Sequence, residues 1–162
     1  MSVAASLVVA RVLHVLGVVV WIGGVAFVTT VVIPLVGQLP DEQERARLFE
    51  SLEARFAWQA RAVTLLTGLS GFFMIHQFDA WGRYLDPAFW WVHIMTLVWL
   101  TFTLVLFVFE PLFLHRWYLA GIERDPERTF RLIQRMHWFL LTLSLTAIVG
   151  AVAGTRGFLR FG

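Results

Sequence analysis

Five histidines and one glutamate are the residues of this sequence best placed to do chemistry. His14 and His93 lie inside long apolar stretches, Glu110 directly follows the stretch that contains His93, and His137 lies near the start of the last one. A neutral imidazole carries one donor and one acceptor, so a histidine surrounded by hydrocarbon needs a partner within the protein. The chain has no cysteine, which leaves histidine as its strongest metal ligand. The pattern indicates metal or haem ligation, or proton exchange.

The composition predicts that these residues sit in a membrane. Hydrophobic residues make up 59% of the chain and charged residues 15%, with a mean hydropathy of +0.73, values outside the range of soluble domains. Four stretches lack charged residues: 12–36, 62–78, 87–109 and 136–155. Each has, or nearly has, the ~20 residues that span a bilayer core as helix. We therefore predict an all-α integral membrane four-helix bundle, forming a single transmembrane domain over 1–162.

The boundaries of these helices follow from capping residues and periodicity. We predict helices over about 4–36, 57–78, 86–119 and 126–156. Asp125 followed by Pro126 is typical of a helix start, with the aspartate as N-cap. Segment 41–56 carries apolar residues at helical spacing between charges. It is predicted to be an amphipathic linker, either lying on the membrane surface or solvated as a helix.

The basic residues predict the orientation. Four helices place both termini on one side, with Arg11, Arg83, Arg156 and Arg160. The other arginines lie on the opposite side: Arg45, Arg47, Arg55, Arg61, Arg116, Arg124, Arg128, Arg131 and Arg135. The positive-inside rule makes that side cytoplasmic, so the termini are periplasmic in a multi-pass protein of the bacterial inner membrane. The net charge of +2 is then a topology signal, and no nucleic-acid partner is implied.

Depth along the helices brings two histidines to one level. With a rise of ~1.5 Å per residue, His14 and His93 come to similar depths near the periplasmic side, and we expect them to face each other. Such a pair suits the two axial ligands of one haem b. Arg11, three residues outward from His14, is then placed to neutralise a haem propionate. His76 is either a third ligand or an interfacial residue.

Glycines near these histidines suggest a flat cofactor. Gly17, Trp21 and Gly24 share a helical face with His14, and Gly71 is expected level with His93. The missing side chains would leave room for a porphyrin beside the imidazoles. The alternative is that the glycines allow close helix packing, as small residues often do in membranes.

Glu110 needs a partner of its own, because an ionised carboxylate near hydrocarbon is costly. Reflecting the last two helices about their connection places His137 at the level of Glu110. We predict a hydrogen-bonded Glu110–His137 pair. It would serve as a proton relay or quinone-head contact, or as a polar clasp between the two helices.

The motifs LHVLGVVVWIGGVAF, with His14, Trp21 and Gly24, and WWVHIM, with His93, resemble those of a known family. They are similar to the copper-resistance D domain and to the related protoporphyrinogen oxidases of the bacterial haem pathway. The resemblance implies a small membrane bundle with a haem b or copper site on its first and third helices. Met95 stands where the oxidase pattern has a lysine, so lysine-dependent oxidation of protoporphyrinogen is not expected.

Three functions are compatible with this pattern. The first is a cytochrome b-like electron carrier with bis-histidine haem b, exchanging electrons with a quinone or a periplasmic redox partner, with or without further catalysis. The second is copper transport or resistance, with copper held by His14, His76 and His93. The third is a structural or assembly subunit of a membrane complex or homo-oligomer, whose histidines are only hydrogen-bonded.

Overall fold

The computed structural model describes residues 2–157, apart from the side chain of His115. The described residues form helices and turns without a strand, which confirms the predicted all-helical class. Arg160, counted above with the periplasmic arginines, lies outside the described residues.

The first helical segment is continuous but changes its winding. It comprises α1 (Val3–Phe27), the π-helical η1 (Val28–Val32) and α2 (Ile33–Gly37), and so covers the predicted range 4–36. Ser2 starts the segment by accepting a hydrogen bond from Ala5 N at 3.3 Å. Pro34 lies near the start of α2 and has no N–H to continue the α-helical pattern. The wider π turn comes directly before it.

The second segment is one long helix, α3 (Glu42–Gln77). The sequence predicted a separate linker over 41–56 and a helix over 57–78, so the linker and the helix are in fact continuous. Asp41 caps the helix by accepting a hydrogen bond from Gln43 N at 2.9 Å. Phe49 in the former linker is buried against Tyr118 and Phe130. One face of this half of α3 therefore packs against the rest of the fold.

The third segment begins after a tight connection. Asp79 takes a left-handed conformation (φ 48°), followed by the 3₁₀ turns η2 (Ala80–Tyr84) and η3 (Pro87–Phe89). Next come α4 (Trp90–Leu104), the π-helical η4 (Val105–Leu114) and α5 (His115–Arg124). Pro111 lies within η4. The helical run thus extends beyond the predicted end at 119.

The last helix is α6 (Pro126–Thr155). The side chain of Asp125 accepts a hydrogen bond from Arg128 N at 2.9 Å, and Pro126 occupies the first helical position. The predicted cap is confirmed.

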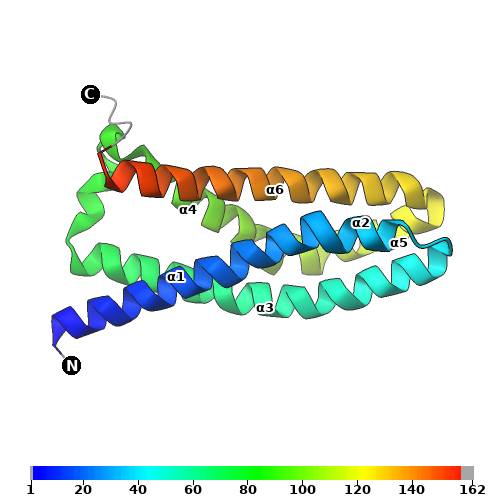
Figure 1. Cartoon of the computed structure of the whole chain (residues 1–162), viewed down its shortest axis with the longest axis horizontal. Coiled ribbons are helices and arrows are strands. Elements are labelled where there is room, and N and C mark those ends of the chain that lie inside the picture. Colours follow the sequence, from blue (N-terminus) through cyan, green and yellow to red (C-terminus); the bar gives the residue numbers. More distant parts are fainter. Residues whose placement is uncertain (1, 158–162) are drawn as a thin grey trace.

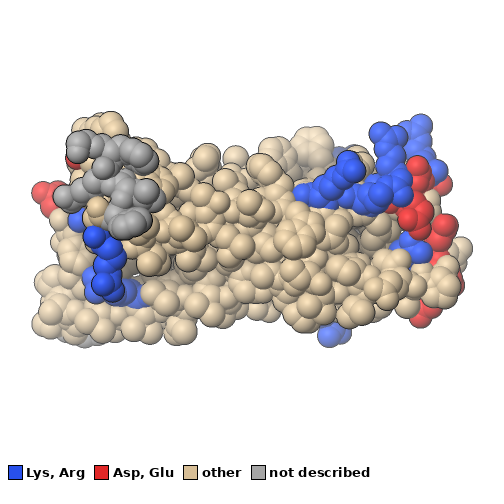
Figure 2. All heavy atoms as spheres, turned by 45° about the horizontal axis from the view of Figure 1, so that its top comes forward, with Lys and Arg blue, Asp and Glu red and all other residues tan. Residues whose placement is uncertain are grey.

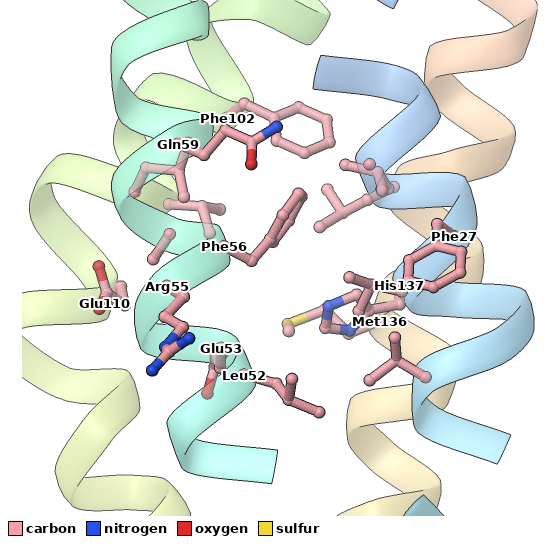
Figure 3. Close-up of a pocket in the computed structure, with 18 of the residues that line it drawn as sticks. Phe27, Leu52, Glu53, Arg55, Phe56, Gln59, Phe102, Glu110, Met136 and His137 are labelled. Atoms are coloured by element: carbon pink, nitrogen blue, oxygen red, sulfur yellow. The ribbon is translucent and has the colours of Figure 1, made fainter. Parts of the chain in front are cut away.

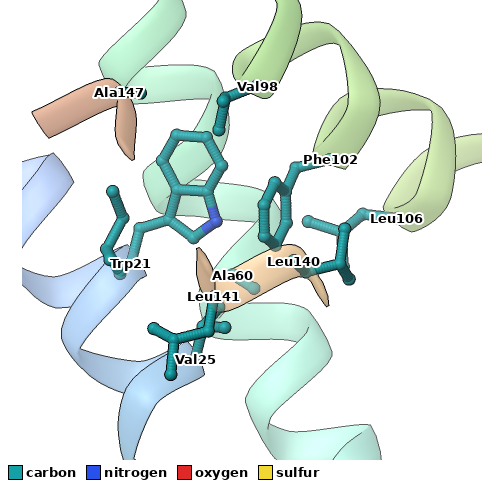
Figure 4. Packing of buried hydrophobic residues seen from close by; sticks show 10 residues of the cluster. Trp21, Val25, Ala60, Val98, Phe102, Leu106, Leu140, Leu141 and Ala147 are labelled. Carbon is teal, nitrogen blue, oxygen red and sulfur yellow. The ribbon is translucent and has the colours of Figure 1, made fainter. Parts of the chain in front are cut away.

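The long helices run side by side along the molecule (Figure 1). The start of α1 and the end of α6 lie at one end, and α2 and α5 lie at the other. The most extensive contact is between α1 and α3, followed by that between α4 and α6. One apolar cluster in the middle gathers Trp21, Val98, Phe102 and Leu140 from three helices (Figure 4). A second lies nearer α2 and α5, around Phe49.

The surface has the charge distribution of a membrane protein. Charged residues gather toward the two ends of the molecule, with a broad uncharged belt between them (Figure 2). Three helical runs are long and apolar enough to cross a membrane: Val3–Gly37, Pro87–Leu114 and Pro126–Thr155. The fourth predicted span lies in α3, which is not among these three. Its first half carries many charges, and Thr64, Thr67 and Ser70 make its second half less apolar.

Candidate functional site

His14 is bound to α3 through one ring nitrogen. Its Nδ1 lies 2.9 Å from the carbonyl oxygen of Thr67 and 3.3 Å from Ser70 Oγ. A carbonyl only accepts, so Nδ1 carries the proton and donates, and Nε2 keeps a free lone pair. The partner that a half-buried imidazole requires is therefore backbone of the neighbouring helix.

The three glycines expected around a porphyrin lie against side chains instead. A Cβ added at Gly71 would approach His14 Cε1 to 3.1 Å, and one at Gly24 would approach Phe56 Cε2 to 2.5 Å. A Cβ at Gly17 would meet the side chain of Thr67. Gly71 thus lies beside His14, one of the two histidines near which the glycines were expected. All three glycines allow close contact between α1 and α3, as in the packing alternative.

Trp21 and Arg11 do not form a cofactor cradle either. Trp21 is 3% exposed in the central cluster, and its ring lies edge-on to Phe102 with centroids 4.8 Å apart. Its buried Nε1 has no hydrogen-bond partner within the described part of the chain. Arg11 is exposed, and residues 2–157 offer it no ion pair.

His93 faces a different part of the molecule from His14. It is exposed, and its Nε2 lies 3.0 Å from the carbonyl oxygen of Tyr84, with the two rings edge to face. The Tyr84 hydroxyl in turn bonds Thr96 Oγ1 at 2.8 Å. His14 contacts α3 whereas His93 contacts the connection before α4, so the two imidazoles are hydrogen-bonded to separate parts of the chain.

These residues do not fit a bis-histidine haem. Side chains of the neighbouring helix occupy the space beside the three glycines, and His93 is hydrogen-bonded to the backbone of Tyr84. His76 is exposed. Within the described residues, no group of three or more His, Cys, Asp or Glu side chains could hold a metal ion.

Glu110 has a partner that the sequence reasoning missed. Arg61 of α3 forms the ion pair with Glu110, and Arg61 Nε also donates to the carbonyl oxygen of Leu106 at 3.0 Å. The predicted pairing with His137 was wrong, because His137 Nδ1 instead bonds the carbonyl oxygen of Ile133 at 2.9 Å. A signal was present: Arg61 is the last charge before stretch 62–78, and Glu110 is the first after 87–109.

Glu110 and His137 nevertheless line one cavity of about 360 Å³. Figure 3 shows Phe56 projecting between α3 and the opposite helices, with Met136 and His137 across from it. The aromatic lining is Phe27, Phe49, Phe56 and Phe102, and the polar lining is Glu53, Arg55, Gln59, Glu110 and His137.

Both π-helical segments contribute to the cavity wall. Val28 and Val32 come from η1, whereas Val105, Leu106, Glu110 and Leu114 come from η4. π-Helical turns are uncommon and occur often at functional sites. Here they widen two opposite helices at the level of the cavity.

The lining of the cavity includes an unusual acid, Glu53. Burial raises the pKa of Glu53, and the neighbouring Glu50 carboxylate raises it further. Burial also raises the pKa of Tyr118 to about 12, with smaller contributions from Glu53 and Glu50. The Tyr118 hydroxyl donates to the carbonyl oxygen of Ala46 at 3.1 Å. The cavity thus combines aromatic walls, an ion pair, an imidazole and a carboxyl group that resists ionisation.

In comparisons with known proteins, no family model matches this chain, and neither a curated protein nor a solved structure does. The site must therefore be interpreted from its own chemistry. Its lining suits a ligand with a flat apolar body and polar oxygens at its edge.

Proposed function

We propose that the chain is an integral protein of the bacterial inner membrane that crosses it as a bundle of four helical segments, with both ends periplasmic. The long helices run parallel to one axis, and most arginines gather at the end with α2 and α5 (Figures 1 and 2). In this orientation that end is cytoplasmic. The cavity then lies in the cytoplasmic half of the bilayer.

We further propose that this cavity binds the headgroup of a lipid-soluble quinone. The observation that carries the proposal is the lining, in which four phenylalanines surround a space that also meets Glu53, Glu110 and His137. A ring of quinone size fits a cavity of about 360 Å³, within the range of known small-molecule sites. The polar groups come from α3, η4 and α6, so they meet the ring at separate points.

Imidazole and carboxyl groups at the cavity support this ligand over a plain acyl chain. His137 Nδ1 is held by Ile133, which leaves Nε2 as an acceptor for a quinol hydroxyl. The Arg61–Glu110 ion pair places charged groups at the cavity wall. A purely apolar ligand would form no favourable polar interaction with them. Binding of a quinone is consistent with a role in membrane electron transfer.

The proposal is tested by titrating the detergent-solubilised protein with a short-chain benzoquinone. Saturable binding at one site is expected. Val28→Phe fills the cavity from η1 and should weaken binding at least tenfold, or ~1.4 kcal/mol. Val31→Phe, on the same segment but exposed and outside the lining, should have no effect. Absence of saturable binding, or equal affinity in both variants, would exclude this site.

A second candidate function is ligation of haem b or copper by His14. The observation in its favour is the hydrogen bond from Nδ1 to Thr67, which leaves Nε2 free, as in histidines that bind metals. The described residues place no second metal ligand beside Nε2 of His14. The visible spectrum of the purified protein tests this candidate directly.

A further inference from the structure

Three side chains at the cavity wall can exchange a proton: Glu53, Glu110 and His137. Two of them already have fixed partners. Glu110 is held in its ion pair with Arg61, where its carboxylate accepts from the guanidinium. His137 donates its Nδ1 proton to Ile133 and offers only an acceptor. Neither is available as a neutral donor to a ligand.

Glu53 differs from both because the described residues provide it with no ion pair. It lies on α3 and is half-buried where α3 meets the cavity. Figure 3 places it on the same helix as Phe56, one turn closer to the cytoplasmic end. Its carboxyl group therefore borders both the cavity and the polar end of the molecule.

The surroundings of Glu53 favour its protonated form. Tyr118 of α5 is close, but its hydroxyl already donates to Ala46. Glu50 on the same helix adds a like charge. The other charged or titratable groups at the cavity are Arg55 on α3, Glu110 on η4 and His137 on α6, whereas the lining residues of α1 and η1 are uncharged. Burial and Glu50 together raise the pKa of Glu53.

We propose that the protonated carboxyl of Glu53 donates a hydrogen bond to a carbonyl oxygen of the bound quinone, so that binding is coupled to protonation from the cytoplasmic side. This inference rests on the proposed quinone site. A neutral carboxyl donates one hydrogen bond, but an ionised carboxylate can only accept. Quinone carbonyls are acceptors, so ionisation of Glu53 converts an attraction into a repulsion between two acceptors.

The sign of the pH dependence follows from this exchange. The affinity for quinone is greatest at low pH, where Glu53 is protonated, and it falls as pH rises through the raised pKa of that carboxyl. Above that value the affinity declines by up to about tenfold per pH unit. The decline ends at the lower affinity of the protein in which Glu53 is ionised and donates no hydrogen bond.

The experiment is a titration with the same short-chain benzoquinone between about pH 5 and 9, in the wild type and three variants. The wild type should lose at least tenfold in affinity across this range. Glu53→Gln keeps a donor that does not ionise, so it should bind with a flat profile. Glu53→Leu removes the donor and should bind weakly at every pH. Glu50→Gln removes the neighbouring charge and should move the decline to lower pH.

The outcomes separate the two proposals. A pH-independent affinity in the wild type, or a decline that persists in Glu53→Gln, would overturn the role of Glu53 while leaving the quinone site intact. No saturable binding in the wild type at any pH would overturn the quinone site and this inference together. Thermal unfolding of each variant shows whether a loss of binding reflects a loss of fold.

Discussion

Arg61 on α3 and Glu110 on η4 form an ion pair that joins two helices across the cavity wall. Their side chains are 26% and 27% exposed. Arg61 also bonds the carbonyl of Leu106, within a π-helical segment whose backbone pattern is already irregular. The pair therefore fixes both the separation of the helices and the form of η4.

Removing one member of this pair should destabilise the protein. We expect Arg61→Gln to lower the free energy of unfolding by about 2 kcal/mol, below the ~3–5 kcal/mol of a fully buried pair because water reaches both side chains. Glu110→Gln should cost less, because the amide oxygen of glutamine can still accept a hydrogen bond from Arg61, and Arg61 keeps its bond to Leu106. Thermal unfolding in detergent measures both. Additive effects in the double variant would show that the two residues are not coupled.

Adjacent glycines on α1 provide a matched test of the α1–α3 contact. Gly24→Ala should destabilise the fold by about 1–3 kcal/mol, because the new methyl group meets Phe56. Gly23→Ala should be neutral or slightly stabilising, because nothing lies within 4 Å of its added Cβ and alanine favours helix. Gly24→Ala should also weaken quinone binding, since Phe56 lines the cavity. Equal stability of the two variants would contradict the close contact.

Arg45 should be the arginine on which the end of the molecule with α2 and α5 depends most. It is 7% exposed, and its guanidinium bonds Glu127 at 2.8 Å and the carbonyl of Leu39 at 2.7 Å. Its charged group also lies 5.6 Å from the centroid of the Phe130 ring. Arg45→Met leaves the carbonyl of Leu39 without its partner, whereas water can solvate the exposed Glu127. The substitution should therefore cost about 1–3 kcal/mol. The exposed Arg47→Met is the control and should change stability by less than about 0.5 kcal/mol.

The absorption spectrum of the reduced protein distinguishes the possible roles of His14 and His93. If the purified protein carries haem b, we expect its visible bands to be lost in His14→Ala and kept in His93→Ala, because His93 is directed to Tyr84. Loss of the bands in both variants would instead establish the bis-histidine pair predicted from the sequence. His76→Ala, an exposed control, should keep the wild-type spectrum. A wild type without visible bands would leave His14 as a packing residue.

Most of what the sequence could predict concerns class and position along the chain. Apolar stretches without charge predicted membrane helices, and three helical runs among the described residues are long and apolar enough to cross a membrane. Asp125 and Pro126 predicted the start of α6, because capping depends on neighbours in sequence. The clustering of arginines at one end also follows from sequence order once the helices are laid antiparallel.

The direction in which each side chain points could not be predicted in this way. A rise of ~1.5 Å per residue converts sequence position into depth, so His14 with His93, and Glu110 with His137, were placed at common levels. Whether two side chains at the same depth face each other also depends on the rotation of each helix about its axis. The π-helical η1 and η4 change that rotation, because a π turn holds more residues than an α turn.

The sequence by itself therefore determined that this protein is helical, apolar and polarised in charge, since these properties depend on composition and local order. Only the tertiary structure decided that Arg61 pairs with Glu110, that His14 bonds α3, and that Glu53 and His137 share a cavity. Such contacts join residues far apart in the chain. They depend on how neighbouring helices are rotated and packed, and no local pattern encodes that arrangement.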